Sequence, residues 1–129
     1  MPWINWMIKV LPVSRVKEIL QRKEQRKARL QASLDSIVNQ LKGIGALKII
    51  LFGSLARGEV DINSDLDLLV LMPSTKTGKE WMNIIYDTIE RRIASNIMVY
   101  NQKEFHDKLP TSSFLQNISK GKVVYEKVA

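Results

Sequence analysis

The sequence predicts an α/β (α+β) protein in which helices pack on a small β-sheet. Two short apolar runs, 48–52 and 66–71, are rich in Ile, Leu and Val, a composition typical of buried strands. Before them, residues 30–41 repeat apolar side chains at the spacing of an amphipathic helix. After them, residues 77–93 combine a helix-start signal with a second apolar stripe.

Length and composition indicate one domain with a core of its own. The chain has 129 residues, of which 45% are hydrophobic and 26% charged, as in ordinary globular proteins. We divide it into an apolar N-terminal arm with a long helix (1–42) and a core (43–129). No apolar run approaches the roughly 20 residues of a membrane span, and the start of the chain lacks the basic region of a signal peptide. We therefore expect a cytoplasmic protein with no membrane partner. The absence of cysteine excludes disulfides and thiolate metal sites.

The net charge of +7 is unevenly distributed. Residues 1–42 hold nine Lys and Arg against three acids, whereas residues 43–129 hold eleven against ten. A nearly neutral core is not the groove expected of a nucleic-acid-binding protein, so direct nucleic-acid binding is not expected. The basic helix leaves contact with a partner or with RNA open.

The first element is predicted to be a long helix. Residues 3–8 form an apolar lead that we expect to pack on the domain or on a neighbouring molecule, with an interaction arm as the alternative. Pro12 ends this lead, and Ser14 can cap a helix that runs to about Lys42. Residues 21–29 contain no large apolar side chain, which favours a solvated face and leaves an acidic partner or RNA as the alternative.

The remaining elements follow the second apolar run in order. Thr77 and Glu80 have the spacing of a capping box, and the helix they open is expected to reach Ile93, with Arg91 and Arg92 in its last turn. Beyond this helix the pattern predicts a strand over 96–100, a polar stretch with the lone histidine His106, a short helix over 113–120 capped by Ser113, and an edge strand over 122–126.

Residues whose side chains could bind a metal or a phosphate lie at the ends of the two central strands. Gly53 and Ser54 directly follow the first strand, while Asp65 and Asp67 open the second. Alternate residues of a strand share a face, so the two aspartates are expected to project together. Paired carboxylates are suitable ligands for Mg²⁺, which takes the rest of its coordination from water and substrate phosphates.

The glycine–serine pair has the properties of a phosphate-binding turn. Gly53 lets backbone approach a phosphate closely, Ser54 offers a hydroxyl and an amide, and Arg57 can add a charge-assisted contact. Either the turn or the Asp-x-Asp pair alone is common as a purely structural feature. Both together, each attached to a strand, favour a phosphate turn that faces a metal site.

The whole arrangement resembles the signature of the DNA polymerase β-like nucleotidyltransferase superfamily: Gly-Ser, ten residues, then Asp-x-Asp. The fuller string Gly53-Ser54, Arg57-Gly58, Ser64-Asp65 and Asp67-Leu68 is similar to the minimal nucleotidyltransferases, the MntA-type antitoxins that are paired with HEPN-domain toxins. The resemblance covers about residues 46–126.

This resemblance implies the polymerase β-like fold, with a small mixed sheet, and a definite chemistry. It implies ATP or another nucleoside triphosphate as substrate, two Mg²⁺ ions, and transfer of AMP to a hydroxyl of a partner HEPN toxin. Carried over by position, Gly53 and Ser54 bind phosphate, with Arg57 beside them, and Asp65 and Asp67 are the catalytic metal ligands.

The third catalytic position of the superfamily, usually a carboxylate, falls on Asn96. An amide oxygen can still ligate Mg²⁺ but cannot accept a proton at neutral pH. Asp61, Glu59 or Asp87 could substitute, and the spacing does not select among them. Besides an antitoxin enzyme, two readings therefore stay open: a nucleotide-binding module that neutralises its partner by binding, and a small-molecule nucleotidyltransferase that would need a homo-oligomer.

Overall fold

The computed structural model describes residues 13–59, 65–90 and 95–128, and its centre is a four-stranded sheet. The strand order is β3-β2-β1-β4, which confirms the mixed sheet and places β4 at an edge. Strand β1 pairs antiparallel with β2 and β4, whereas β2 and β3 are parallel. The strands are β1 (Lys48–Phe52), β2 (Leu66–Met72), β3 (Ser95–Asn101) and β4 (Lys122–Glu126), close to the predicted ranges.

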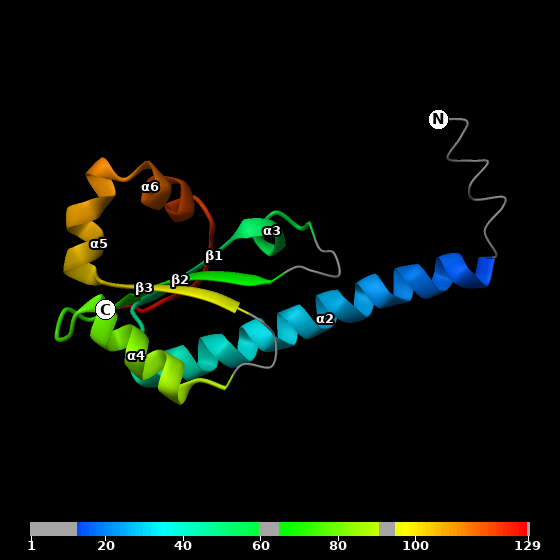
Figure 1. Ribbon diagram of the computed structural model, residues 1–129, viewed down its shortest axis with the longest axis horizontal. Helices are drawn as coiled ribbons and strands as arrows, with labels where there is room; N and C mark the ends of the chain where they lie inside the picture. The colour runs from blue at the N-terminus through cyan, green and yellow to red at the C-terminus, as the bar shows by residue number, and fades with distance from the viewer. Residues whose placement is uncertain (1–12, 60–64, 91–94, 129) are drawn as a thin grey trace.

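Helices cover both faces of this sheet (Figure 1). One face carries α2 (Val13–Ile44) and α4 (Gly78–Thr88). The other carries α5 (Gln102–Lys108), the 3₁₀ turn η1 (Leu109–Thr111) and α6 (Ser113–Ser119). The single turn α3 (Gly53–Ala56) follows β1. Within the described parts of the chain, no helix is both long and apolar enough to cross a membrane.

Strand β2 shows how the sheet divides the core. Leu66, Leu68 and Val70 are fully buried against the α2–α4 layer. Leu69, one position out of phase, packs with Ile118 of α6 on the other face. The period of two therefore assigns each residue of β2 to one layer, and Asp67 falls on the α5–α6 side.

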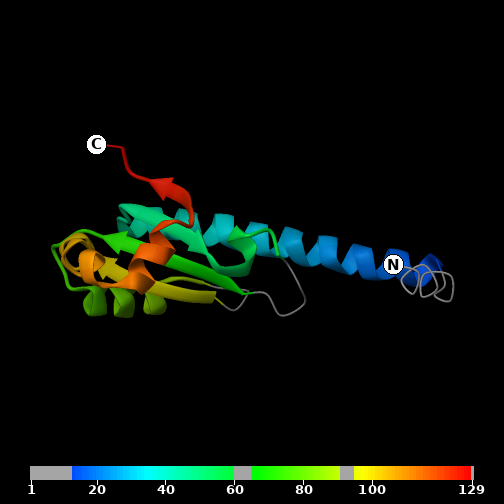
Figure 2. The ribbon, with the colours of Figure 1, turned by 90° about the horizontal axis from the view of Figure 1, so that it is seen from above.

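Helix α2 differs along its length. The predicted stripe Leu30, Leu34, Ile37 and Leu41 is buried, with at most 4% of each residue exposed, and it packs on the sheet. Residues 15–29, which we call the projecting segment, contain no buried residue, and α2 extends past the end of the sheet there (Figures 1 and 2). Residues 21–29 are thus not buried in the domain, which agrees both with a solvated face and with the alternative of a partner contact. Residues 3–8 and Pro12 lie outside the described residues.

The helix after β2 starts as predicted and ends early. Thr77 accepts a hydrogen bond from the Glu80 amide at 3.1 Å, which confirms the capping box. Helix α4 ends at Thr88, because Ile89 has extended backbone with ψ of 130°. Ile89 is still buried, so its apolar side chain continues the helical pattern in the sequence although the helix itself has ended. Arg91, Arg92 and Ile93 lie outside the described residues.

Two features after β3 differ from the prediction. The polar stretch around His106 is helix α5, which Asn101 caps by accepting a hydrogen bond from the Glu104 amide at 2.7 Å. The Glu104 carboxylate in turn accepts a hydrogen bond from the backbone N–H of Asn101 at 2.9 Å, which completes a capping box. Helix α6 is capped by Ser112 and not by Ser113, since the Ser112 hydroxyl accepts from the amide three residues on.

Because one part of α2 is buried and the other is exposed, the same Leu→Ala change should lower the free energy of unfolding by different amounts in the two parts. Leu30→Ala removes a fully buried side chain and should lower the free energy of unfolding by about 2–5 kcal/mol. Leu20→Ala, at a residue that is 57% exposed, should change it by less than about 0.5 kcal/mol. Urea unfolding of both variants measures this difference, and similar losses in the two would contradict the division.

Candidate active site

The candidate site lies at the end of the sheet where β1 stops and β2 and β3 begin. Phe52, the last residue of β1, pairs with Asp67, and Asp67 pairs with Asn96 on the parallel strand β3. The neighbours Leu68 and Ile97 are buried in the α2–α4 layer, so alternation places Asp67 and Asn96 together on the opposite face. Asn96, the third position that the resemblance implies, therefore shares a face of the sheet with Asp67.

Gly53 is in direct contact with the Asp67 carboxylate. A Cβ atom added to Gly53 would collide with Oδ2 of Asp67. Gly53 also has φ of +76°, a left-handed conformation that residues with a side chain adopt only with strain. Both constraints require glycine at this position. They also mean that the Gly-Ser pair and the Asp-x-Asp pair, separated in the sequence, form one site.

The electrostatics of Asp67 indicate a place for a cation. Burial raises the pKa of its carboxyl above the ordinary 3.8, and the nearby charge of Asp65 raises it further. A hydrogen bond with the Asn96 side chain and the positive charge of Arg57 act in the opposite direction and lower this pKa. The pKa of Asp67 stays raised on balance, chiefly because burial disfavours the ionised carboxylate, and a bound cation would stabilise that ionised form.

The donor atoms fit a hard divalent cation. Asp65 and Asp67 supply carboxylate oxygens, and the Asn96 amide keeps an oxygen that can ligate while its NH₂ group donates to Asp67. In the described parts of the chain, no group of three or more His, Cys, Asp and Glu side chains could hold a metal ion. The residue that pairs with Asp67 on β3 is the neutral Asn96.

The expected phosphate turn is the first turn of α3. Gly53 and Ser54 open this short helix, and the Arg57 amide donates to both of their carbonyl groups, at 3.3 and 3.1 Å. The Arg57 guanidinium forms an ion pair with Glu59 at 3.3 Å. Because both side chains of the pair are more than 60% exposed, the pair is weak and Arg57 can turn to an anion.

A hollow of about 500 Å³ opens beside this turn and contains cations that the sequence did not assign. Gly53 and Arg57 line one wall, and Lys120 and Lys122 line the other. The two walls meet closely, since a Cβ on Gly121 would lie 2.5 Å from the carbonyl oxygen of Leu51. Among the described residues that line this hollow, none is acidic. It is therefore suited to an anion such as a polyphosphate.

The residues that could replace the third carboxylate, Glu59, Asp61 and Asp87, differ in their position relative to Asp67. Asp87 is on α4, which packs on the opposite face of the sheet from Asp67, so it cannot serve. Glu59 follows α3 and is ion-paired with Arg57. Asp61 lies outside the described residues. His106 is exposed on α5, which follows the end of β3 distant from Asn96.

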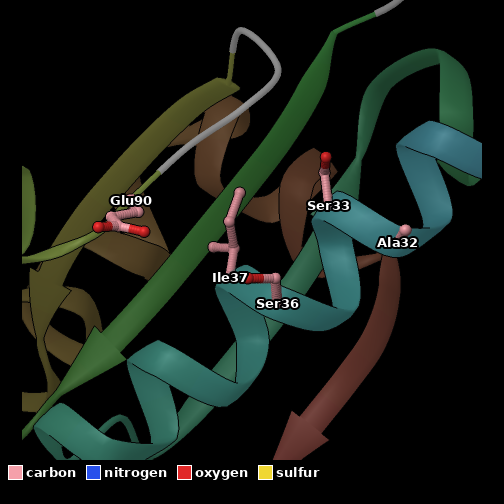
Figure 3. A pocket seen from close by; sticks show the side chains of 5 residues that line it. All are labelled: Ala32, Ser33, Ser36, Ile37 and Glu90. Carbon is pink, nitrogen blue, oxygen red and sulfur yellow. The ribbon is translucent and has the colours of Figure 1, made fainter.

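A second hollow, of about 320 Å³, lies between α2 and Glu90. Figure 3 shows Ser33 and Ser36 on α2 with Glu90 across from them. The backbone of Glu90 is held there by the Gln40 side chain, through bonds of 2.9 and 3.0 Å. This hollow is on the α2–α4 side, and among the described residues that line it the charged one is the acid Glu90.

Comparison with known proteins agrees with this geometry. Residues 33–124 match the family model described as nucleotidyltransferase domain, a range that contains all six predicted site residues. The fold is similar to a crystal structure of a candidate nucleotidyltransferase from Sulfolobus solfataricus, with a TM-score of 0.59 and 16% identity over 81% of this chain and 87% of that one. No curated protein matches the chain at a significant level.

The raised pKa of Asp67 predicts a site that destabilises the metal-free protein. The folded state holds the Asp67 proton more tightly than the unfolded state does, so this group's contribution to stability falls as pH rises from the ordinary 3.8 through the raised value. In EDTA at neutral pH, Asp67→Asn should therefore melt at a higher temperature than the parent, and the advantage should vanish at pH 3. Asp107→Asn, at an exposed position, is the control and should not show this pattern. A lower melting temperature for Asp67→Asn would contradict the assignment.

Proposed function

Because the chain belongs to the nucleotidyltransferase domain family and is therefore a transferase, we propose that it transfers AMP from ATP in a Mg²⁺-dependent reaction. The acceptor we propose is a hydroxyl of a partner HEPN-domain toxin, which makes the chain a cytoplasmic antitoxin. The contact between Gly53 and the Asp67 carboxylate carries the proposal, because it joins a phosphate turn to a pair of metal-type ligands.

The residues divide the work of binding between two sides of the site. On one side, Gly53 and Ser54 present a turn without side-chain obstruction, and Arg57, Lys120 and Lys122 surround the adjacent hollow with positive charge. A triphosphate laid across the turn would neutralise these cations. On the other side, Asp65 and Asp67 would hold Mg²⁺, with the Asn96 oxygen as a neutral ligand.

Catalysis of this kind depends on positioning and charge neutralisation. Bound Mg²⁺ would stabilise the negative charge that develops on the transferred phosphoryl group and the pyrophosphate that leaves. Asn96 orients Asp67 through the hydrogen bond between their side chains. Arg57 and Lys120 would fix the phosphates so that the α-phosphorus faces the acceptor hydroxyl.

The identity of the acceptor rests on the motif string. Gly53-Ser54, Arg57-Gly58 and Asp67-Leu68 stand in the arrangement found in the minimal nucleotidyltransferases that act on HEPN toxins. This resemblance supports ATP as donor and a protein hydroxyl as acceptor.

Asn96 favours a second candidate function. A neutral amide beside Asp67 weakens the affinity for metal and cannot accept the proton of an attacking hydroxyl. The chain would then act as a nucleotide-binding module that neutralises its partner chiefly by occupying it. The two functions share the same ATP site and differ in turnover.

The metal-ligand assignment predicts a loss of Mg²⁺-dependent binding. Titration calorimetry with ATP should give Mg²⁺-dependent heat for the parent. In Asp65→Ala/Asp67→Ala this heat should be lost, because the carboxylates that hold the ion are gone. The same double variant should fail to transfer labelled AMP to the HEPN-domain product of the neighbouring gene. Equal Mg²⁺-dependent affinities in parent and variant would remove the site assignment.

Restoring a carboxylate at residue 96 should increase turnover. Asn96→Asp is nearly isosteric, adds a third charge for Mg²⁺ and supplies a group that can accept the hydroxyl proton. Transfer of labelled AMP should rise by at least about tenfold, within the usual range for a general base. Asn117→Asp also adds a carboxylate, but in the hollow beside α3 and not on the strand that pairs with Asp67, so it should not increase transfer. If the parent already transfers rapidly and Asn96→Asp changes nothing, another residue serves as the base.

A further inference from the structure

Helix α2 carries a stripe of eight positions on one face, apolar except for two lysines, and the sheet covers only part of it. Its positions follow steps of four and three residues, the period at which helices pack side by side in coiled coils. The stripe consists of Val16, Leu20, Lys23, Lys27, Leu30, Leu34, Ile37 and Leu41. The last four are buried against the sheet, and the first four, which we call the upstream stripe, are not buried.

The upstream stripe lies on the projecting segment of α2. This segment, residues 15–29, is about 22 Å long at the rise of an α-helix. It extends past the end of the sheet at which β2 begins (Figures 1 and 2). On it, Leu20 is 57% exposed and the adjacent Ile19 is 46% exposed, so the segment offers aliphatic surface beside its charges.

Charge on the projecting segment restricts what can cover it. Residues 15–29 contain seven Lys and Arg and two Glu, a net charge of +5. A second copy of this chain would bring two such segments together and be repelled. The segment has no aromatic residue on which a nucleic-acid base could stack, and its exposed aliphatic side chains have no counterpart in a phosphate backbone. An acidic protein surface with apolar residues satisfies both features.

We propose that the upstream stripe is the docking surface for an acidic amphipathic helix of a partner protein. The partner helix would extend the stripe's coiled-coil packing, with apolar residues opposite Val16 and Leu20 and carboxylates opposite Lys23 and Lys27. The surface is separate from the catalytic residues, and its proposal does not depend on the reaction proposed above.

The C-terminal end of the upstream stripe lies near α3, the short helix that begins with Gly53 and Ser54. Lys27 lines a hollow of about 830 Å³ together with Leu55, Ala56 and Gly58 of the α3 region. Leu34 and Val38 of α2 contribute apolar wall to the same hollow. A helix docked on the stripe would therefore reach α3, whose first residue is Gly53 of the candidate site.

Binding of defined probes to the full chain tests the docking surface. The first probe is a fluorescent helical peptide of about three heptads, with Leu at the packing positions and Glu beside them. The second has the same composition in scrambled order, and the third is a single-stranded RNA of similar length. Anisotropy at near-physiological ionic strength, without nucleotide or Mg²⁺, should give an affinity for the amphipathic peptide at least about tenfold above the other two.

Two charge-matched variants locate the surface. Lys23→Glu/Lys27→Glu reverses the cations of the stripe and should weaken the amphipathic peptide by at least about tenfold. Lys17→Glu/Arg29→Glu makes the same change in net charge on other faces of α2 and should weaken it by less than about threefold. All four residues are exposed, so melting curves should match the parent's.

The other occupants give different results. Equal losses in the two variants, or equal affinity for the scrambled peptide, would mean attraction by net charge alone and overturn the proposal. Tighter binding of RNA than of the amphipathic peptide would assign the segment to nucleic acid. A dimer in sedimentation that Lys23→Glu/Lys27→Glu abolishes would assign it to a second copy. A photo-crosslink from residue 20 to residues 1–12 would assign it to the chain's own start.

Discussion

The site depends on one steric constraint: the Asp67 carboxylate occupies the space that a side chain on residue 53 would fill. The antiparallel register brings this about, since Phe52 pairs with Asp67 and the chain then turns directly over the carboxylate. Glycine at 53, the left-handed turn and the start of α3 all follow from that register. A slip of one residue would move Asp67 into the apolar α2–α4 layer and separate the two halves of the site.

The same constraint explains why stability and function oppose each other here. Packing the turn against Asp67 removes water from a carboxylate that also faces Asp65, so the ionised form is disfavoured. The hydrogen bond with Asn96 offsets part of this cost without adding charge. A third carboxylate in that place would bind metal more tightly and repel more strongly in its absence. The amide is thus the less strained choice and the weaker ligand.

Sequence reasoning succeeded where local pattern decides structure. The period of a strand placed Leu66 and Leu68 in the core on the side opposite Asp67, whereas Asn96 was assigned through the family resemblance and meets Asp67 through the pairing of β2 with β3. Sequence reasoning missed Lys120 and Lys122, since their position beside Arg57 depends on the pairing of β4 with β1, far apart in the chain. It missed α5, whose capping pair Asn101 and Glu104 lies at the end of a strand, and it extended α4 past Thr88 because Ile89 stays buried outside the helix. The antitoxin role, the HEPN partner and the roles of the site residues stay predictions.

The apolar repeat of helix α2 extends beyond the residues that the sheet buries. Burial against the sheet explains a stripe from Leu30 onward, because those side chains leave water. It does not explain why the same period continues to Val16, beyond the last residue that the sheet covers. A helix face that only meets water has no need of Val16 and Leu20 in phase with the core. An apolar repeat that continues beyond the residues buried by the sheet is expected where a second surface packs against the same face of the helix. The placement of Lys27 beside α3 puts that surface next to the turn that begins at Gly53.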